Sequence, residues 1–201
     1  MILLLPWGED VSGAAARLGV DAARTLALDP LVPWGRRQVL MRSPATEPAR
    51  LGMVHGWLGA AGATVTVISD SVGFVAQRVL AMIVNTACEI AQRGIASPED
   101  IDDAVRIGLG YPYGPLAWGD AIGPAPILAI LQGLQAASGD PRYRPSLWLR
   151  RRALLGLSLA APDRAAGTHE QPGVRCAAAR RVPVADRPAE GAQRNRPGRA
   201  S

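Results

Sequence analysis

The sequence has few aromatic residues, two histidines and two cysteines. Aromatics make up 4% of the 201 residues, so the core must be built mainly from alanine, valine, leucine and isoleucine. The two cysteines stand in different contexts, which excludes a disulfide framework. Cys88 lies in an apolar helical run and is expected to be a small core residue. Cys176 and His169 are too isolated in the sequence to form a metal site.

Long uncharged apolar runs are also absent. A membrane-spanning helix needs about 18 or more such residues in succession, so we expect no membrane span and no membrane partner. The opening run, MILLLPW, is too short for a secretory leader, and no positive charge precedes it. A cytoplasmic location is therefore the default expectation.

Strong net charge is absent from most of the chain. The formal net charge is +5, but residues 161–201 carry eight arginines and four acids and account for +4 of it. A basic tail can bind nucleic acid without sequence preference. We favour a tail without that role, because the remaining 160 residues are almost neutral.

Residues 1–69 alternate between strand-like and helix-like segments. We expect strands over 2–6, 24–29, 38–42 and 64–68, and helices over 11–18 and 47–61. This alternation favours a small parallel sheet. The segment is short for a dinucleotide-binding domain, which usually has two βαβαβ halves, so we expect a partial, degenerate Rossmann-like α/β segment.

A glycine-rich phosphate-binding turn is missing from this segment. The first expected strand runs into Pro6-Trp-Gly-Glu-Asp10, which has one glycine and two acids. A GxGxxG turn lets the backbone approach a pyrophosphate at a helix N-terminus, whereas two acids would repel it. No P-loop pattern occurs elsewhere. We therefore expect residues 1–68 to bind no dinucleotide unaided.

A long helix is expected over residues 74–93, followed at Gly94 by a glycine suited to a helix end. Its polar residues fall on one narrow stripe: Arg78, Asn85, Glu89 and Gln92. A stripe so thin predicts a mostly buried helix. Gln77 lies about 100° away from that stripe. Its side chain must point either into a packed neighbour or into a cleft. A buried amide must be hydrogen-bonded in a packed neighbour, and it could bond a ligand in a cleft, so both alternatives stay open.

The next helix has a strong start signal. Ser97 is the expected N-cap, Pro98 the first helical residue, and Asp100 an acid in the first turn. A loop rich in glycine and proline, GLGYPYGP over 108–115, follows. Such a loop can bring the backbone close to a ligand, or it can be a tight connector. Further helices are expected over 116–122, 125–138 and 147–157, and residues 160–201 have a disordered composition.

Four stretches carry a resemblance to a known family: DSVGFVAQR (70–78), ASPEDID (96–102), GLGYPYGP (108–115) and GDPRYRP (139–145). In this order and spacing they resemble the C-terminal domain of the 3-hydroxyacyl-CoA dehydrogenases. The resemblance implies a mainly α fold, with a helical domain like the C-terminal domain of 6-phosphogluconate dehydrogenase. The ending RPSLWLRRRALLGLSL resembles a second copy of that domain, found in 3-hydroxyadipyl-CoA dehydrogenase-type bacterial enzymes. We expect a partial α/β segment over 1–69, the helical domain over 70–159 and a disordered basic tail over 160–201.

The resemblance also implies an activity: oxidation of (S)-3-hydroxyacyl-CoA to 3-oxoacyl-CoA with NAD, in fatty-acid β-oxidation or phenylacetate breakdown. The family's helical domain lines the acyl-CoA cleft and often forms a dimer contact. Candidate substrate-binding residues are therefore Gln77, Tyr111, Pro112, Tyr113 and Gly114. The partners implied are an acyl-CoA substrate and either a second copy of the chain or a nucleotide-binding domain.

The family's catalytic groups are not matched. Its histidine base falls on Leu40, which cannot accept a proton, the asparagine that follows falls on Ser43, and the supporting glutamate falls on Gly52. The catalytic asparagine of the helical domain falls on Gln77, which keeps the amide but places it one methylene further out. No catalytic or cofactor-binding residue is thus identified, and NAD is implied by the resemblance alone. His55 lies elsewhere and is expected to be structural or at the surface.

Three interpretations stay open. The chain is the C-terminal part of a 3-hydroxyacyl-CoA dehydrogenase that is inactive alone, or it is a non-catalytic dimerisation or acyl-CoA-binding module. The third interpretation is a truncated or frame-altered product, which the change of composition after Leu159 suggests. If the chain binds acyl-CoA, the run Arg150–Arg152 is a candidate contact for the CoA phosphates, and a solvated basic face is the alternative.

Overall fold

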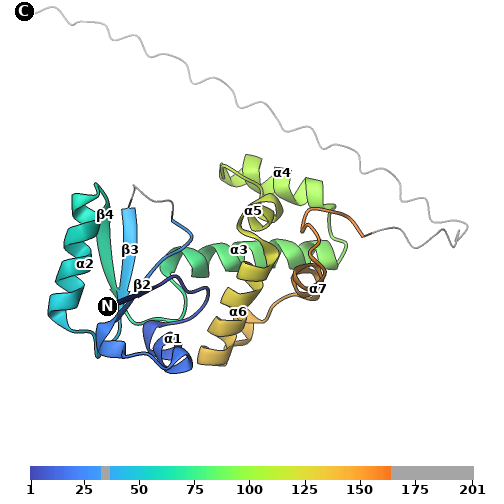
Figure 1. The fold of residues 1–201 in the computed structure, drawn as a ribbon. Helices are drawn as coiled ribbons and strands as arrows, with labels where there is room; N and C mark the ends of the chain where they lie inside the picture. The colour runs from blue at the N-terminus through green and yellow to red at the C-terminus, as the bar shows by residue number, and fades with distance from the viewer. Residues whose placement is uncertain (33–36, 164–201) are drawn as a thin grey trace, which may run out of the picture. The chain divides into compact units, whose positions relative to one another are not determined.

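A computed structural model describes residues 1–32 and 37–163, and these contain four strands and seven α-helices (Figure 1). The α/β segment comprises β1 (Ile2–Leu4), α1 (Val11–Leu18), β2 (Thr25–Leu28), β3 (Arg37–Arg42), α2 (Pro48–Ala60) and β4 (Thr64–Ser69). The helical part comprises α3 (Val75–Gln92), α4 (Pro98–Leu109), α5 (Pro115–Ile122), α6 (Pro124–Ser138) and α7 (Leu147–Leu155). The expected mainly α fold with a partial α/β segment is confirmed.

The four strands form one sheet in the order β1-β2-β3-β4. β1 pairs with β2 and β3 with β4 in parallel, but β2 and β3 are antiparallel. The prediction of a parallel sheet is therefore wrong at its centre. A helix connects each parallel pair, whereas no helix is found in the described part of the short connection from β2 to β3. Parallel strands need a crossover of about a dozen or more residues, and residues 29–36 are too few.

The two faces of the sheet carry separate apolar clusters, because successive side chains of a strand point to opposite faces. On one face, Leu26, Leu28 and Leu40 pack against α2 through Val54 and Leu58. The clustered residues of the other face are Val11 of α1, Ala27, Met41 and Phe74. The sheet is thus covered by α1 on one face and by α2 on the other.

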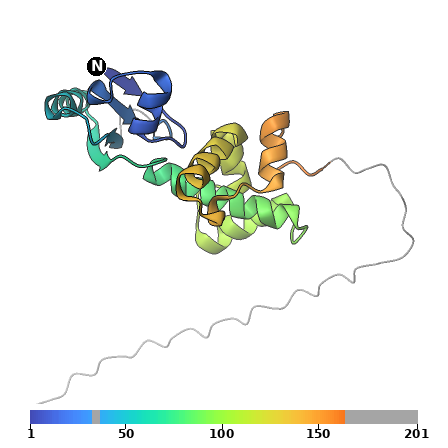
Figure 2. The same ribbon diagram turned by 90° about the horizontal axis from the view of Figure 1, so that it is seen from below.

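α3 is the axis of the helical part. It contacts α4, α5, α6 and α7, which lie around it in Figure 2. One core cluster fills the space between these helices, with Val84 and Cys88 from α3 and Ile127 and Leu131 from α6 fully buried in it. The cluster confirms that α3 is a mostly buried helix.

The expected helix ends are confirmed at α3 and α4. Gly94 has a φ of 63°, the left-handed conformation that glycine accepts without strain. Ser97 caps α4, since its Oγ accepts a hydrogen bond from the Asp100 amide at 3.1 Å. Pro98 occupies the first turn of α4. Local sequence signals therefore determine where α3 ends and α4 begins.

The turn between β1 and α1 joins the sheet to the helices. Trp7 packs against the helical core, and the backbone of Gly8 lies directly on α6. A Cβ at Gly133 of α6 would overlap the carbonyl oxygen of Gly8, so the two backbones are closer than any other residue pair would permit. Residues 1–163 accordingly form one compact unit.

The ordered contacts continue past residue 159, where the sequence analysis placed the end of the helical domain. The Leu159 and Ala160 amides donate to the Asp120 carboxylate, and Arg152 donates to the Ala161 carbonyl. Residues 160–163 are thus anchored. The expected disorder of residues 164–201, together with His169 and Cys176, lies outside the described residues, and the boundary expected at residue 69 stays a prediction.

No single helix in the described ranges is long and apolar enough to cross a membrane. α5 and α6 reach that length and composition only together and are bent by 95° at their junction. Buried core helices often have such a composition.

Replacing Gly133 tests the contact between the β1–α1 turn and α6. We expect Gly133→Ala to lower the free energy of unfolding by about 1–3 kcal/mol, because the new methyl group overlaps the Gly8 carbonyl. The matched control is Gly56→Ala in α2, where a Cβ meets nothing within 4 Å. That change should stabilise by roughly 0.5–1 kcal/mol. Urea unfolding followed by circular dichroism measures the free energy of unfolding of both variants. Equal changes in the two variants would contradict the close contact between Gly8 and Gly133.

Candidate functional site

Gln77, matched by resemblance to the family's catalytic asparagine, is fully buried, and both its amide oxygen and its amide nitrogen are hydrogen-bonded. Its Oε1 accepts from the Gly8 amide at 3.0 Å. Its Nε2 donates to the Pro6 carbonyl at 3.1 Å and to Asp29 Oδ1 at 3.0 Å. The side chain points into a packed neighbour, one of the two alternatives that the sequence left open. It has the geometry of a structural amide that links α3 to the sheet.

Asp29, the residue after β2, is the other polar group of this junction. Its Oδ1 accepts from Gln77 and from the Leu31 amide, at 3.0 and 3.1 Å. Its Oδ2 has no hydrogen-bond partner among the described residues, although Asp29 is almost completely buried. Burial raises the pKa of the Asp29 carboxyl above its ordinary value, while the bonds from Gln77 and Leu31 oppose the rise. The junction thus holds a carboxyl for which the charged form is costly.

The residues matched by resemblance alone to the family's base and its neighbours have no group placed for proton transfer. Leu40 is fully buried in the apolar cluster under α2. Ser43 is buried, and its Oγ lies 3.1 Å from Thr46 Oγ1. Gly52 and His55 lie exposed on α2, so His55 is at the surface. Leu40 lies beside Asp29, whose amide donates to the Val39 carbonyl, yet Asp29 itself is closed off from solvent.

The turn before α1 does not fit the pyrophosphate of NAD. Anions bind at a helix N-terminus through its free N–H groups, but at α1 these groups already have partners. The Val11 and Ser12 amides donate to the Asp70 carboxylate at 2.7 and 3.2 Å, and the Gly13 amide donates to Asp10. Gly8 is pressed against α6. The described residues therefore contain no phosphate cradle at this turn.

The loop before α5 is held by one carboxylate. Asp102 of α4 accepts from the Leu116 and Ala117 amides at 2.7 and 2.9 Å and so caps α5. A Cβ at Gly114 would overlap Asp102, which explains the glycine. This arrangement is that of a tight connector between two helices, the simpler of the two interpretations of the loop.

The tyrosines of this loop lie against a tryptophan of α5. The rings of Tyr111 and Tyr113 each lie 6.2 Å from that of Trp118, between ring centroids. Tyr113 and Pro112 are exposed, and Tyr111 is half-buried. The five residues proposed for substrate binding are therefore not brought together: Gln77 lies in the sheet junction and the other four in this loop.

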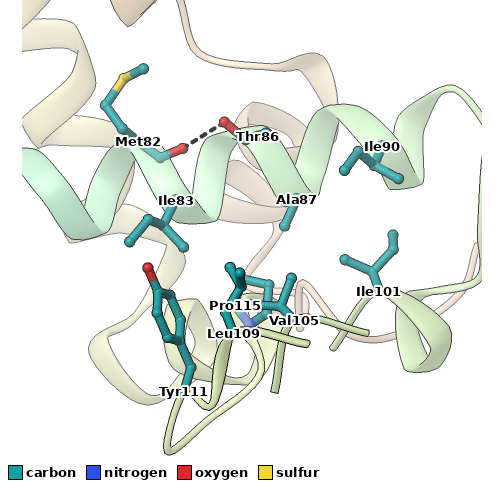
Figure 3. Close-up of a pocket in the computed structure, with 10 residues that line it drawn as sticks. All are labelled: Met82, Ile83, Thr86, Ala87, Ile90, Ile101, Val105, Leu109, Tyr111 and Pro115. Atoms are coloured by element: carbon teal, nitrogen blue, oxygen red, sulfur yellow. Dashed lines mark hydrogen bonds between the residues drawn. The ribbon is translucent and has the colours of Figure 1, made fainter. Parts of the chain in front are cut away.

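A groove of about 300 Å³ lies between α3 and α4 (Figure 3). Its lining is almost entirely apolar, and the single polar side chain on the α3 side, Thr86, turns its hydroxyl to the Met82 carbonyl. Of the predicted substrate-binding residues, Tyr111 alone contributes to it. We call this feature the α3–α4 groove, and its lining residues are Met82, Ile83, Thr86, Ala87, Ile90, Ile101, Val105, Leu109, Tyr111 and Pro115.

The arginine run of α7 divides into two kinds of residue. Arg150 and Arg151 are exposed, but Arg152 is buried over the Trp148 ring, with its guanidinium carbon 3.2 Å from the ring centroid. Arg152 also donates to Asp163 Oδ1 at 2.9 Å. Arg152 therefore fits neither of the two interpretations of the run, a contact for CoA phosphates or a solvated basic face, because it is buried and its hydrogen bonds fix the residues after α7.

Cys88 is a buried core residue, as expected, and burial raises the pKa of its thiol to about 12. It has the environment of an inert thiol. Within the described residues no group of three or more histidine, cysteine, aspartate or glutamate side chains is placed to hold a metal ion.

Comparison with known proteins identifies the helical part. Residues 73–162 match the family model described as "3-hydroxyacyl-CoA dehydrogenase, C-terminal domain". This part of the chain belongs to the 3-hydroxyacyl-CoA dehydrogenase family. The 3-hydroxyadipyl-CoA dehydrogenase of Escherichia coli K12 is 50% identical over 155 residues, which cover 77% of this chain and 32% of that protein. A probable 3-hydroxybutyryl-CoA dehydrogenase of Bacillus subtilis is 40% identical over 90 residues, covering 45% of this chain and 31% of that protein.

Solved structures extend the similarity into the sheet. A 3-hydroxybutyryl-CoA dehydrogenase of E. coli K12 superposes with a TM-score of 0.69 at 36% identity, over 77% of this chain and 32% of that one. The (S)-3-hydroxybutyryl-CoA dehydrogenase of Ralstonia eutropha superposes with a TM-score of 0.66 at 27% identity, over 78% of this chain and 56% of that one. Both matched regions are longer than residues 70–201, so they reach into the α/β segment. The chain spans about a third of the length of its curated relatives.

The Asp29 carboxyl should make stability depend on pH. Because burial raises its pKa, the folded state binds this proton more tightly than the unfolded chain does. The contribution of Asp29 to the free energy of unfolding is therefore fully present below the ordinary carboxyl pKa. It is lost as pH rises through the raised pKa of the folded state. We expect Asp29→Asn to gain stability relative to the wild type as pH rises from about 4 to about 8.

The measurement is urea unfolding of the two proteins across this pH range. Glu99→Gln, an exposed acid in the first turn of α4, is the control and should follow the wild type more closely. If the difference in the free energy of unfolding between Asp29→Asn and the wild type did not change with pH, it would contradict a buried carboxyl with a raised pKa.

Proposed function

We propose that this chain is the helical, substrate-facing part of an NAD-dependent 3-hydroxyacyl-CoA dehydrogenase and does not oxidise substrate alone. One observation carries the proposal: the family's amide position, Gln77, is used inside the fold, and the base position, Leu40, is a buried leucine. A general base must have a titratable group within reach of the proton that it removes. The described residues offer none at these positions.

The substrate class follows from the relatives. The similar proteins are named for 3-hydroxyadipyl-CoA and 3-hydroxybutyryl-CoA, so an acyl-CoA thioester is the substrate that we propose for the complete enzyme. NAD would be bound by a nucleotide-binding domain outside the described residues, because the N-terminus of α1 is already filled by Asp70 and Asp10. We place this activity in acyl-CoA catabolism, of the β-oxidation or phenylacetate type, in the cytoplasm.

A second function, association with another helical domain, is supported by the α3–α4 groove. Its apolar lining includes the exposed Leu109 of α4, and exposed apolar side chains continue along α3 at Val75 and Val79. Exposed apolar surface of this kind marks interaction sites. We infer that a second helical domain of the same family packs here, from another copy of the chain or from the rest of a longer enzyme.

The activity of the purified chain tests the first proposal. With a 3-hydroxyacyl-CoA and NAD, we expect no NADH formation by absorbance, while the E. coli 3-hydroxyadipyl-CoA dehydrogenase serves as positive control. Leu40→His restores the residue type of the family but should stay inactive, because the site is sealed under α2. NADH formation that persists through repurification would contradict the proposal.

A charge in the α3–α4 groove tests association. Val105→Glu should raise the dissociation constant of the complex at least about tenfold, since an unpaired charge is costly in an apolar contact. The matched control is Leu154→Glu, because Leu154 is exposed on α7 and does not line the groove. Sedimentation velocity measures the mass of each protein. A wild type that is monomeric at every concentration, or equal behaviour of both variants, would exclude self-association through this groove.

A further inference from the structure

The outward face of α2 is almost free of charge. α2 covers one face of the sheet through Val54 and Leu58 and lies outermost on that face (Figure 1). Arg50 is the one charged residue of this helix. A solvated helix face normally carries charged residues, and a helix that is apolar all round is normally buried. The outward face therefore has the composition of a contact surface. Its exposed residues are Pro48, Ala49, Gly52, Met53, His55, Gly56, Trp57, Gly59 and Ala60.

Large apolar side chains and glycines occur together on this face. Trp57 is 58% exposed and Met53 is 40% exposed. A Cβ at Gly52, Gly56 or Gly59 would meet no described atom within 4 Å, and none of the three has the left-handed backbone that requires glycine. Glycine inside a helix is unfavourable relative to alanine. An outward glycine leaves space for a large side chain of another molecule, and Trp57 and Met53 are side chains of that size.

Four residues of this face have the spacing of a coiled-coil seam. Ala49, Met53, Gly56 and Ala60 are separated by four, three and four positions, as the a and d positions of a heptad are. At 100° per residue they lie within about 60° of one another on the helix surface. They lie opposite Leu58, which is buried against the sheet. We call these four residues the α2 seam, and a seam of this kind packs against another helix.

The helix that best fits the α2 seam is the α2 of a second copy, in the antiparallel direction. A two-fold axis midway between residues 54 and 55 sets Met53 opposite Gly56 of the other copy, and Ala49 opposite Ala60. Each layer then contains either one large and one small residue or two small residues, so the same surface is complementary to itself. In a parallel pair, Met53 would face Met53 and Gly56 would face Gly56, which combines crowding with a void.

Charge favours the same arrangement. Arg50 and Trp57 lie on one flank of the seam, and Gly52 and Gly59 lie on the other. An antiparallel pair brings Arg50 of each copy beside Trp57 of the other, in a cation–π contact. It also brings Arg50 near the C-terminal end of the other α2, where a cation is favourable and where α2 has no basic residue of its own. The ion pair of Arg50 with Glu47 is exposed and therefore weak.

We propose that the outward face of α2 is a self-association surface, on which α2 of a second copy packs antiparallel with Met53 facing Gly56. Helices of this length touch along about 20 Å, which places the contact at the small end of specific interfaces. The dimer should therefore form reversibly and depend on concentration. The inference is independent of the proposed function, because it uses neither the Gln77 junction nor the α3–α4 groove.

Cysteine pairing tests the register. Ala49→Cys and Ala60→Cys are made in separate chains that both carry Cys176→Ser, while the remaining Cys88 is buried. When the two chains are mixed and oxidised, a disulfide should link residue 49 of one chain to residue 60 of the other. Each chain oxidised alone should stay monomeric, because residue 49 is then far from residue 49 of its partner. A parallel pair would give the reverse pattern.

An exchange of side-chain sizes tests the contact in solution. Gly56→Met should raise the dissociation constant of the dimer at least about tenfold, because two methionines then meet in one layer. The double variant Met53→Ala/Gly56→Met again pairs a large residue with a small one and should bind within about threefold of the parent. Ala137→Met, at an exposed position of α6, is the control and should have no effect.

Sedimentation equilibrium measures these dissociation constants, and circular dichroism establishes that each variant is folded. All chains carry Val105→Glu, so that association through the α3–α4 groove does not contribute. A parent chain that is monomeric at every concentration would assign the face to a different protein and overturn the proposal. Disulfides between identical chains, or a double variant that binds as weakly as Gly56→Met, would also overturn it. Turnover by the isolated chain would contradict the proposed function alone.

Discussion

The side-chain amide of Gln77 holds the two parts of the chain together. It accepts one hydrogen bond and donates two, all to residues of the α/β segment more than 40 positions away. Because the amide is fully buried, loss of any partner would leave a polar group without water or protein, at a cost of about 1–3 kcal/mol each. The Gly8–Gly133 contact lies beside this junction and requires the same docking of the β1–α1 turn.

This use of Gln77 determines what the chain can do. Both N–H groups of this amide are used by Pro6 and Asp29, its oxygen accepts from Gly8, and its complete burial keeps it from a substrate. Asp70 has a similar effect at α1, where its carboxylate occupies the amides to which a phosphate would bind. Both arrangements use in the fold polar groups that would otherwise be free to bind a ligand. The described residues keep the helical architecture of the family's C-terminal domain.

The helices could be predicted because their signals are local. Ser97, Pro98 and Gly94 specify the ends of α4 and α3 within a few residues. The antiparallel pairing of β2 and β3 could not be predicted, since strand direction depends on the path between strands. Asp29 was missed because its partner, Gln77, is 48 positions away and both residues have ordinary sequence surroundings.

The sequence predicts which polar residues of α3 share one face of the helix, but it does not predict their hydrogen-bond partners. Asn85 bonds the Arg144 carbonyl and the Ser146 amide, and Gln92 accepts from the Trp148 amide. These contacts anchor the start of α7 to α3. Helical periodicity shows which residues share a face, but it does not show what covers that face.

The most direct test is amide hydrogen exchange on the wild type and Gln77→Leu, followed across β1–β4 and α3–α7. In the wild type, the slowest amides of the sheet and of the helices should open with the same free energy, because the two parts unfold together. In Gln77→Leu, the sheet amides should open at a lower free energy than the amides of α3 and α6. Independent opening of the sheet in the wild type, or unchanged exchange in the variant, would contradict the central role of Gln77.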